Sequence, residues 1–277
     1  MPYNYFEYKF TVNPKEPWEE ILLAQLSSLS FESFDLNDGL LKAYVPEKFD
    51  SSINLDSLSV FKLKEVSIHF EKKMIPPANW NARWESSFQP IIIGEDCVVR
   101  ADFHPPMGKK YELIITPKMS FGTGHHETTQ MMLDFALNIT FTEKEVLDMG
   151  CGTGVLGILS RIKGAKNVKA IDNDPWCIEN TLENAKRNHC SNINVELADY
   201  LKEDKPYYDL IFANINRNVL LDQLTSYTKV LKPNGILLLS GFYQEDIAVI
   251  RNKAIVNGLT IEDQKSLGLW RALKFKK

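Results

Sequence analysis

Glycines and an acid in residues 146–154 are spaced as in loops that bind nucleoside ligands. This segment, Val-Leu-Asp-Met-Gly-Cys-Gly-Thr-Gly, predicts a buried strand that runs directly into a glycine loop and then into a helix. Glycine removes the Cβ atom that would block a ligand, and a helix N-terminus offers the ligand unpaired N–H groups. Gly150 and Gly152 are therefore predicted to contact a ligand. Gly152-x-Gly154-x-x-Gly157 also satisfies the dinucleotide fingerprint in form.

The acid Asp148 separates two classes of ligand for this loop. A carboxylate two residues before the first glycine repels a pyrophosphate and attracts a cation. S-adenosylmethionine carries an ammonium group, a sulfonium group and no phosphate. We therefore expect S-adenosylmethionine as the cofactor, with a nicotinamide dinucleotide as the alternative.

Three polar side chains follow predicted strands, at the edge where open α/β sheets bind their ligands. Asp172 follows the strand 168–171 and is expected to accept hydrogen bonds from ribose hydroxyls. Asp199 follows the next strand and is either a contact of the adenine amino group or an ordinary capping or surface acid. Asn214 offers an acceptor and a donor, so it is the predicted catalytic residue, orienting the acceptor amine or the methionine end of the cofactor. Its alternative reading is a turn asparagine that faces solvent.

A glycine- and histidine-rich loop, Phe-Gly-Thr-Gly-His-His-Glu-Thr-Thr at residues 121–129, precedes a predicted helix over 130–138. We expect this loop to lie over the cofactor. Adjacent histidines point apart, and His125-His126-Glu127 does not have the spacing of a zinc helix, so no metal is expected.

From residue 145 onward, predicted strands and helices alternate, which is typical of a doubly wound parallel sheet. The predicted strands are 146–149, 168–171, 193–197, 210–215 and 236–240, and the predicted helices are 155–163, 175–188, 217–231 and 244–256. Residues 259–264 and 269–276 resemble a hairpin, so an antiparallel edge is expected. Such an edge is unlike that of a dinucleotide-binding fold.

The first 74 residues predict a separate ferredoxin-like α+β domain with the order β-α-β-β-α-β. Its predicted elements are a strand over 3–12, a helix over 17–29, a hairpin of 30–36 and 40–45, a weak helix over 50–58 and a strand over 61–70. Residues 75–88, with Trp80 and Trp84, predict a linker helix in which the two tryptophans pack. The second domain is then 89–277.

Composition narrows the class of protein further. The 277 residues carry 32 basic and 36 acidic side chains, which disfavours direct binding of nucleic acid. Residues 1–75 contain 8 basic and 12 acidic side chains, leaving 24 of each for 76–277, so the acidic excess lies at the N-terminal end. This end either attracts a basic partner or is an ordinary solvated surface. Four scattered cysteines, no leader and no apolar run that spans a bilayer predict a cytoplasmic protein away from membranes. We expect it to be a monomer.

Four motifs together resemble the bacterial methyltransferase family that modifies the eleventh large-subunit ribosomal protein. They are FGTGHHETT, VLDMGCGTG, DNDPWCIENTLENAKRN and FANI. The glycine motif alone marks only S-adenosylmethionine-dependent methyltransferases in general, whereas the histidine-threonine loop ahead of it is much more specific. The resemblance covers nearly the whole chain, and its N-terminal part resembles the family in layout only.

The resemblance implies a class I, seven-stranded, Rossmann-like methyltransferase domain behind a domain that recognises the ribosomal protein. It places cofactor contacts on Thr129, Gly150, Asp172 and Asn214, with His126 as a neighbour in the same loop. Family members methylate N-terminal α-amines and lysine ε-amines, so an in-line attack by a neutral amine is expected, with water or a loop group removing the proton. Asn216-Arg217 gives the loop after the fourth strand a polar character that departs from the pattern.

Several alternatives remain open at this point. A release-factor glutamine methyltransferase characteristically has Asn-Pro-Pro-Tyr where residues 214–217 read Asn-Ile-Asn-Arg. A nicotinamide oxidoreductase is opposed by Asp148 and by the predicted terminal hairpin. A methyltransferase of another protein or of a small-molecule amine, and a non-catalytic ribosome-assembly factor, would both keep the fold.

Overall fold

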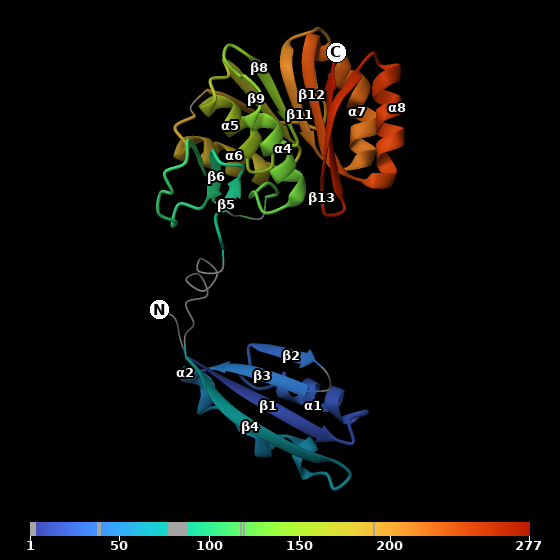
Figure 1. The fold of residues 1–277 in the computed structure, drawn as a ribbon. Coiled ribbons are helices and arrows are strands. Elements are labelled where there is room, and N and C mark those ends of the chain that lie inside the picture. The colour runs from blue at the N-terminus through green and yellow to red at the C-terminus, as the bar shows by residue number, and fades with distance from the viewer. Residues whose placement is uncertain (1–3, 38–39, 77–87, 117, 119, 191) are drawn as a thin grey trace. The chain divides into compact units, whose positions relative to one another are not determined.

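The computed structural model describes residues 4–37, 40–76, 88–116, 118, 120–190 and 192–277. The chain divides into two compact units, residues 1–87 and 88–277 (Figure 1). Of the linker helix predicted over 75–88, residues 77–87 lie outside the described residues, and Ile75 ends a strand. None of the described helices combines the length and apolar character needed to cross a bilayer.

The first unit contains a four-stranded antiparallel sheet with the strand order β2-β3-β1-β4. Its elements are β1 (Tyr5–Asn13), α1 (Trp18–Leu26), β2 (Ser33–Asn37), β3 (Leu40–Pro46), α2 (Glu47–Asp50) and β4 (Ser67–Ile75). Strand β1 buries the alternate side chains Tyr8, Phe10 and Val12 in a cluster with Leu22 and Leu26 of α1. The alternation of apolar residues therefore predicted this strand correctly.

The second half of this unit differs from the prediction. In place of the helix over 50–58 and the start of the strand over 61–70, two 3-10 helices occupy Leu55–Ser57 and Ser59–Lys62. Val60 is fully buried, so the apolar residues here fill the core from short turns rather than from a strand. Strands β2 and β3 pair as the hairpin prediction required, although the turn residues 38–39 lie outside the described residues.

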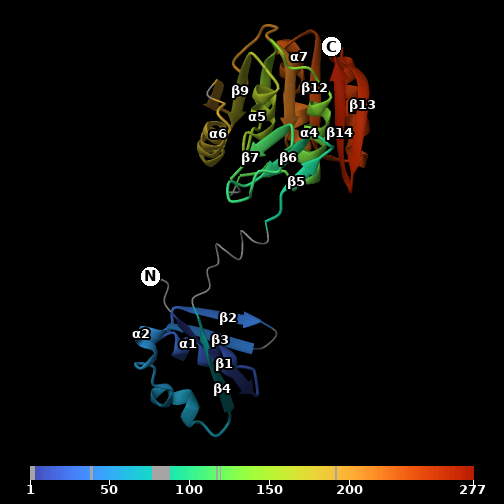
Figure 2. The ribbon, with the colours of Figure 1, turned by 60° about the vertical axis from the view of Figure 1, so that its left-hand side comes forward.

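Within the described residues of the second unit, seven strands form one sheet in the order β10-β9-β8-β11-β12-β14-β13. Figure 2 shows β14 between β12 and β13 at one edge of this sheet. The strands are β8 (Glu145–Met149), β9 (Asn167–Asp172), β10 (Ile193–Leu197), β11 (Tyr208–Asn214), β12 (Leu231–Tyr243), β13 (Thr260–Leu267) and β14 (Trp270–Lys276). Strands β8 to β12 pair in parallel, whereas β14 pairs antiparallel with both β12 and β13. The predicted parallel sheet and its antiparallel edge are confirmed.

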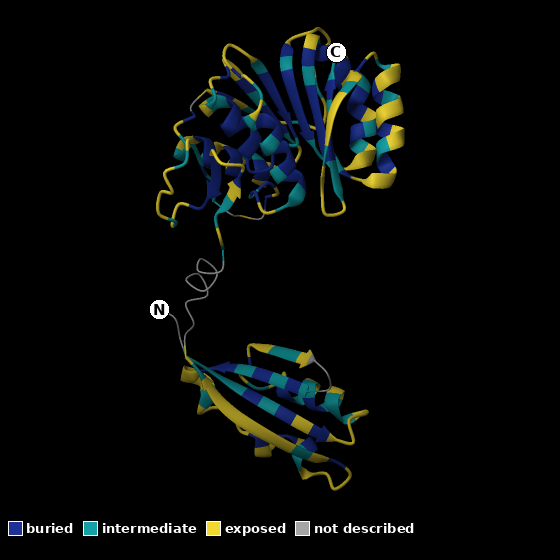
Figure 3. Ribbon diagram, viewed as in Figure 1, coloured by how far each residue is buried: buried dark blue, intermediate teal, exposed yellow. Residues whose placement is uncertain are grey.

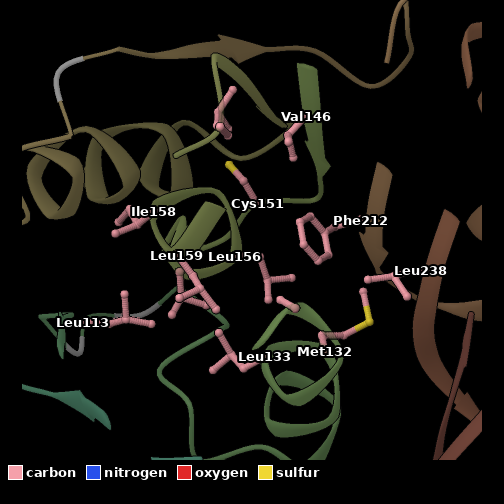
Figure 4. Close-up of a cluster of buried hydrophobic side chains, with 14 of the residues drawn as sticks. Leu113, Met132, Leu133, Val146, Cys151, Leu156, Ile158, Leu159, Phe212 and Leu238 are labelled. Atoms are coloured by element: carbon pink, nitrogen blue, oxygen red, sulfur yellow. The ribbon is translucent and has the colours of Figure 1, made fainter. Parts of the chain in front are cut away.

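Helices cover both faces of this sheet (Figure 1). They are α4 (Glu127–Leu137), α5 (Val155–Ile162) and α6 (Pro175–Arg187) on one face, and α7 (Arg217–Val230) and α8 (Ile247–Val256) on the other. Leu210 and Phe212 of β11 belong to the core beneath α4 and α5, and the alternate residues Ile211 and Ala213 belong to the core beneath α7 and α8 (Figure 4). The central strands are accordingly buried, whereas α8 exposes its outer side (Figure 3).

A small three-stranded sheet, which the sequence analysis did not foresee, precedes α4. Its strands are β5 (Ile91–Ile93), β6 (Cys97–Arg100) and β7 (Tyr111–Ile114). Strand β7 packs on α5 and β5 packs on α4. The contacts with α4 and α5 therefore hold this small sheet, and with it the chain that leads into the loop ahead of α4.

Candidate active site

A cavity of about 840 Å³ lies at the carboxyl ends of the parallel strands. Gly150 follows β8, Asp172 ends β9, Asp199 follows β10 and Asn214 ends β11, and all four line this cavity. The parallel topology brings these residues together, because the carboxyl ends of parallel strands meet at one edge of a sheet. The volume is within the range of ordinary ligand sites.

The glycine loop, which we define as residues 150–154, closes tightly over the end of β9. The N–H groups of Gly150 and Cys151 both donate to the carbonyl of Ile171, at 2.8 and 3.0 Å. Gly150 has a φ of +72° and Gly152 a φ of +56°, both in the left-handed region. A Cβ at Gly150 would lie 2.2 Å from Cγ2 of Ile215, so only glycine leaves room here.

Asp172 holds the glycine loop and faces the cavity at the same time. Its Oδ2 accepts from the N–H of Gly152 at 2.9 Å, and its Oδ1 accepts from the N–H of Asp174 at 3.0 Å. A carboxylate has about four acceptor positions, so two remain for hydroxyl donors. The geometry is compatible with the ribose contact predicted for Asp172.

Replacing Asp172 is expected to weaken cofactor binding through both of these roles. Asp172→Ala removes an acceptor for ribose hydroxyls and leaves the N–H of Gly152 unpaired, so we expect a loss of about 1.5–3 kcal/mol of binding free energy. Calorimetric titration with S-adenosylmethionine measures it. Asp172→Asn, which keeps one acceptor oxygen, should lose less, and equal affinity of wild type and Asp172→Ala would exclude Asp172 from the site.

Asp199 and Asn214 differ in how the protein holds them. Asp199 is exposed, and its backbone carbonyl accepts from Nε2 of Gln223 at 2.8 Å, which fixes the chain but leaves the carboxylate at the cavity edge. Asn214 presents a buried Oδ1 that has no hydrogen-bond partner among the described residues. Because a buried acceptor without a partner is costly, this atom is suited to a donor on a bound ligand.

The loop ahead of α4 brings His126 to the cavity, and not His125, and the first turn of α4 adds Thr128. His126 is the N-cap of α4, where its Nδ1 accepts from the N–H of Thr128. Nε2 of His125 lies 3.0 Å from the carbonyl oxygen of Gln89, away from the cavity lining, so the two histidines do point apart. No group of three or more His, Cys, Asp or Glu side chains in the described part of the chain is placed to hold a metal ion.

Thr129 occupies a different position from its neighbour. It is fully buried, its hydroxyl has no partner in the described part of the chain, and it is not among the residues that line the cavity. Thr128 lines the cavity instead. The contact of Thr129 with the cofactor, which the family resemblance implies, stays a prediction, since Thr129 does not line the cavity.

Aromatic side chains form one wall of the cavity. The ring centroid of His126 lies 4.8 Å from that of Phe121 and 4.8 Å from that of Trp270. The ring centroid of Tyr243 lies 4.4 Å from that of Trp270, although Tyr243 is not among the residues that line the cavity. Phe121 is the first residue of the loop predicted to lie over the cofactor, whereas Trp270 lies in the terminal hairpin, for which no role in the site was predicted. Gly241 and Ile215 also line the cavity and were missed, although each directly follows a predicted strand or site residue.

Asp148 does not line the cavity, although its place two residues before the first glycine predicted a contact with a cationic ligand. It is 1% exposed, lies outside the cavity lining and accepts from the N–H of Gly157 at 3.0 Å through Oδ2. Burial raises the pKa of Asp148 to about 7, against the smaller opposite effect of the Gly157 N–H. The side chain points toward α5 because Gly157 has no side chain there: a Cβ would lie 3.3 Å from Oδ2.

The charge of the residues that line the cavity indicates the class of ligand, although Asp148 is not one of these residues. Four carboxylates line the cavity, namely Asp172, Asp174, Asp199 and Asp222, and the lining contains no Lys or Arg in the part of the chain that the structure describes. Such a surface repels phosphates and attracts a cation. The unpartnered Oδ1 of Asn214 and the glycine loop complete a site for a positively charged nucleoside. S-adenosylmethionine fits this description. The fold and this cavity define an α/β methyltransferase that uses S-adenosylmethionine.

Comparisons with known proteins agree with this class. The family model described as Ribosomal protein L11 methyltransferase (PrmA) matches residues 20–277. Proteins named ribosomal protein L11 methyltransferase are 44% identical in Porphyromonas gingivalis, covering 99% of this chain and 98% of the relative, and 39% identical in Bacteroides fragilis, covering 98% and 99%. The crystal structure of a ribosomal protein L11 methylase from Lactobacillus delbrueckii subsp. bulgaricus superposes with a TM-score of 0.63 at 25% identity, covering 68% of this chain and 98% of that one. The chain belongs to the ribosomal protein L11 methyltransferase family.

Proposed function

We propose that this chain transfers methyl groups from S-adenosylmethionine to amino groups of the eleventh large-subunit ribosomal protein, namely lysine ε-amines, the N-terminal α-amine or both. The observation that carries the proposal is the unpartnered Oδ1 of Asn214 at the edge of an acidic cavity that lacks Lys and Arg in the described residues. The names of the relatives support the choice of protein substrate. Gly150, Gly152, Asp172 and Asp199 are the proposed cofactor contacts, together with Asn214 and Thr129.

Asn214 is the proposed catalytic residue. S-adenosylmethionine supplies an electrophilic methyl group when it is bound. The carbonyl of Asn214 accepts an N–H of the amine and turns the nitrogen lone pair into the cavity. A lysine has an ordinary pKa near 10.4 and must give its proton to water or to a loop group before its nitrogen attacks the methyl group. A neutral carboxamide suits this position better than a carboxylate, which would stabilise the ammonium form. Phe121 and Trp270 line the same cavity and give one side of it an apolar, aromatic surface.

His126 has a structural role in this proposal. Its Nδ1 already accepts the N–H of Thr128 at the start of α4, and a backbone N–H is always the donor. Nδ1 is thus engaged and does not serve as a free base. The ring packs between Phe121 and Trp270 and fixes the wall of the cavity.

The two units are assigned separate tasks in the proposal. Residues 1–74 form a ferredoxin-like domain that recognises the ribosomal protein, and 89–277 form the seven-stranded methyltransferase domain, with 75–88 as the segment that joins them. The strand order β2-β3-β1-β4 is that of a ferredoxin-like sheet, which supports the first assignment. The acidic excess of this end of the chain supports a basic partner. A cytoplasmic monomer without direct nucleic-acid contacts fits the same proposal.

Replacing Asn214 is expected to affect turnover more than folding. Asn214→Ala removes the acceptor that orients the amine, so we expect a loss in kcat of about tenfold or more. The free energy of unfolding should change little, because Oδ1 has no partner among the described residues. Methyl transfer at saturating cofactor, with urea unfolding of the same preparation, measures both quantities. Wild-type kcat in the folded variant would remove Asn214 from the mechanism.

The proposed substrate is tested by mass spectrometry of the ribosomal protein after incubation with enzyme and S-adenosylmethionine. Addition of methyl groups at amines is expected, and the peptide map gives their positions. An unmodified ribosomal protein, in a preparation that binds S-adenosylmethionine by calorimetry, would exclude this substrate. A preparation that does not bind the cofactor would contradict the assignment as a methyltransferase.

The recognition role of the first unit is tested by a chain that begins at Phe88. It is expected to keep cofactor affinity, because every proposed contact lies at Thr129 or beyond, and to lose methyl transfer to the ribosomal protein. The affinity of the full chain for that protein should fall with added salt, since exposed charges are screened over about 8 Å at physiological ionic strength. Transfer by the shortened chain at the efficiency of the full chain would disprove the recognition role.

A further inference from the structure

We propose that Asn184 is a positioning residue that locks together the two loops of the cofactor site, an inference that rests on the proposed use of S-adenosylmethionine. The loops are the glycine loop (150–154) and the histidine loop, which we define as residues 120–126. Asn184 lies in the last turn of α6, is fully buried and is not among the residues that line the cavity. Its effect on the cofactor must therefore pass through the loops.

The carboxamide of Asn184 joins two segments that are far apart in the sequence. Its Oδ1 accepts from the N–H of Thr116 at 3.0 Å, just after β7. Its Nδ2 donates to the carbonyl of Thr153 in the glycine loop at 3.0 Å and to Oδ1 of Asn180 at 3.1 Å. One buried side chain thus fixes both the chain that leads into the histidine loop and the glycine loop itself.

Thr153 carries the connection on to the histidine loop. Its N–H donates to the carbonyl of Phe121 at 2.9 Å, and its hydroxyl donates to the carbonyl of Gly122 at 2.6 Å. Thr153 is fully buried and does not line the cavity. Because Phe121 does line it, a shift of Thr153 moves a wall of the cofactor site.

Only a carboxamide makes this set of bonds at that place. The N–H of Thr116 needs an acceptor and the carbonyl of Thr153 needs a donor, and Asn offers one of each on a short, rigid stem. An aspartate would face the carbonyl of Thr153 with a second acceptor. Alanine would leave both buried backbone groups unpaired, and such groups move to find new partners.

The chain provides a matched control one turn further along α6. Asn188 binds the same strand in the same way, since its Oδ1 accepts from the N–H of Ile114 at 2.8 Å and its Nδ2 donates to the carbonyl of Ile114 at 2.7 Å. Its remaining bond is to the carbonyl of Asn184 within the helix, and none of the three reaches the glycine loop. Asn188→Ala therefore removes a comparable attachment of α6 to β7 and leaves Thr153 in place.

The experiment compares wild type, Asn184→Ala and Asn188→Ala in the full chain. Calorimetric titration with S-adenosylmethionine should show an affinity about tenfold lower for Asn184→Ala and within twofold of wild type for Asn188→Ala. Hydrogen exchange without cofactor should be faster in peptides of the histidine loop in the Asn184 variant only. A purely structural role for Asn184 would lower the unfolding midpoint of both variants and leave both the affinity and that exchange unchanged, which would overturn the proposal.

A second pair of variants decides the question if Asn184→Ala does not fold. Thr153→Val removes the hydroxyl bond to the carbonyl of Gly122 while keeping the shape of the side chain, and Thr153→Ser keeps the hydroxyl. Lower affinity in Thr153→Val with near wild-type affinity in Thr153→Ser supports the connection, and equal affinities of these two variants contradict it. Failure of wild type itself to bind S-adenosylmethionine would instead contradict the proposed function.

Discussion

Gly152→Ala is expected to reduce affinity for S-adenosylmethionine by more than a hundredfold. A Cβ at residue 152 would lie 2.2 Å from the backbone carbonyl oxygen of Phe121, a contact that no rotation of a side chain relieves. The histidine loop and the glycine loop must then separate, and both contribute to the cavity. The φ of +56° adds a further cost of about 1–2 kcal/mol for a residue with a Cβ. Calorimetry and circular dichroism of the same preparation measure binding and folding.

Gly258→Ala is the matched control for this prediction. Gly258 also has a left-handed φ, of +84°, but a Cβ there would meet nothing within 4 Å. It follows α8 and is not among the residues that line the cavity. Both variants therefore have the backbone strain of a left-handed residue with a Cβ, but only Gly152→Ala has the close contact with Phe121. Equal cofactor affinity in the two variants would show that the approach of Phe121 to Gly152 does not shape the site.

Asp148→Asn is expected to make the protein more stable at pH 8 than wild type. Burial raises the pKa of Asp148 to about 7 from an ordinary value of 3.8. The unfolded chain releases this proton near pH 3.8 and the folded chain retains it until about pH 7, so the unfolded state binds fewer protons between these values. The contribution of Asp148 to stability is thus greatest at low pH and falls as the pH rises through this window. The total loss is on the order of 4 kcal/mol.

The carboxamide reproduces the protonated acid without its titration. An asparagine at 148 keeps an acceptor for the N–H of Gly157 and a donor in place of the acid hydroxyl. Urea unfolding of wild type and variant at pH 5 and pH 8 should show a stability difference that grows by on the order of 2–3 kcal/mol in favour of the variant. A difference independent of pH would mean that Asp148 keeps an ordinary pKa in the folded protein.

The sequence predicts which edge of the sheet carries the site, because this edge is determined by the order of strands and helices. Alternating strands and helices predict a parallel sheet, and a parallel sheet gathers its strand ends, so Asp172 and Asn214 were expected together before any coordinates. Gly150 and Gly152 were recognisable because a glycine directly after a buried strand has few other uses. These inferences need only the order of elements and the residue at each strand end.

Other features of the site could not be predicted, because they depend on the direction of a side chain or on contacts between residues far apart in the sequence. Asp148 was assigned to the ligand because position along a strand does not say which face a residue occupies, and only the missing side chain of Gly157 makes room for it under α5. Trp270 reaches the cavity through a hairpin far along the chain. Asn184 and Asn188 looked like part of an ordinary polar helix face, because their partners Thr116 and Ile114 lie about 70 residues earlier in the chain.

The order of strands in the large sheet imposes an order of assembly on the catalytic unit during synthesis. Strand β14 follows β13 in the chain but lies between β12 and β13 in the sheet. Until residues 270–276 leave the ribosome, β13 lacks the strand with which it pairs, and α4 lacks one of the strands against which it packs. Strands β13 and β14 form a local hairpin, whereas α4 and β14 lie far apart in the sequence, and contacts between such distant segments form slowly compared with local structure. The wall of the cavity that contains Trp270 is therefore completed only after β14 has been made.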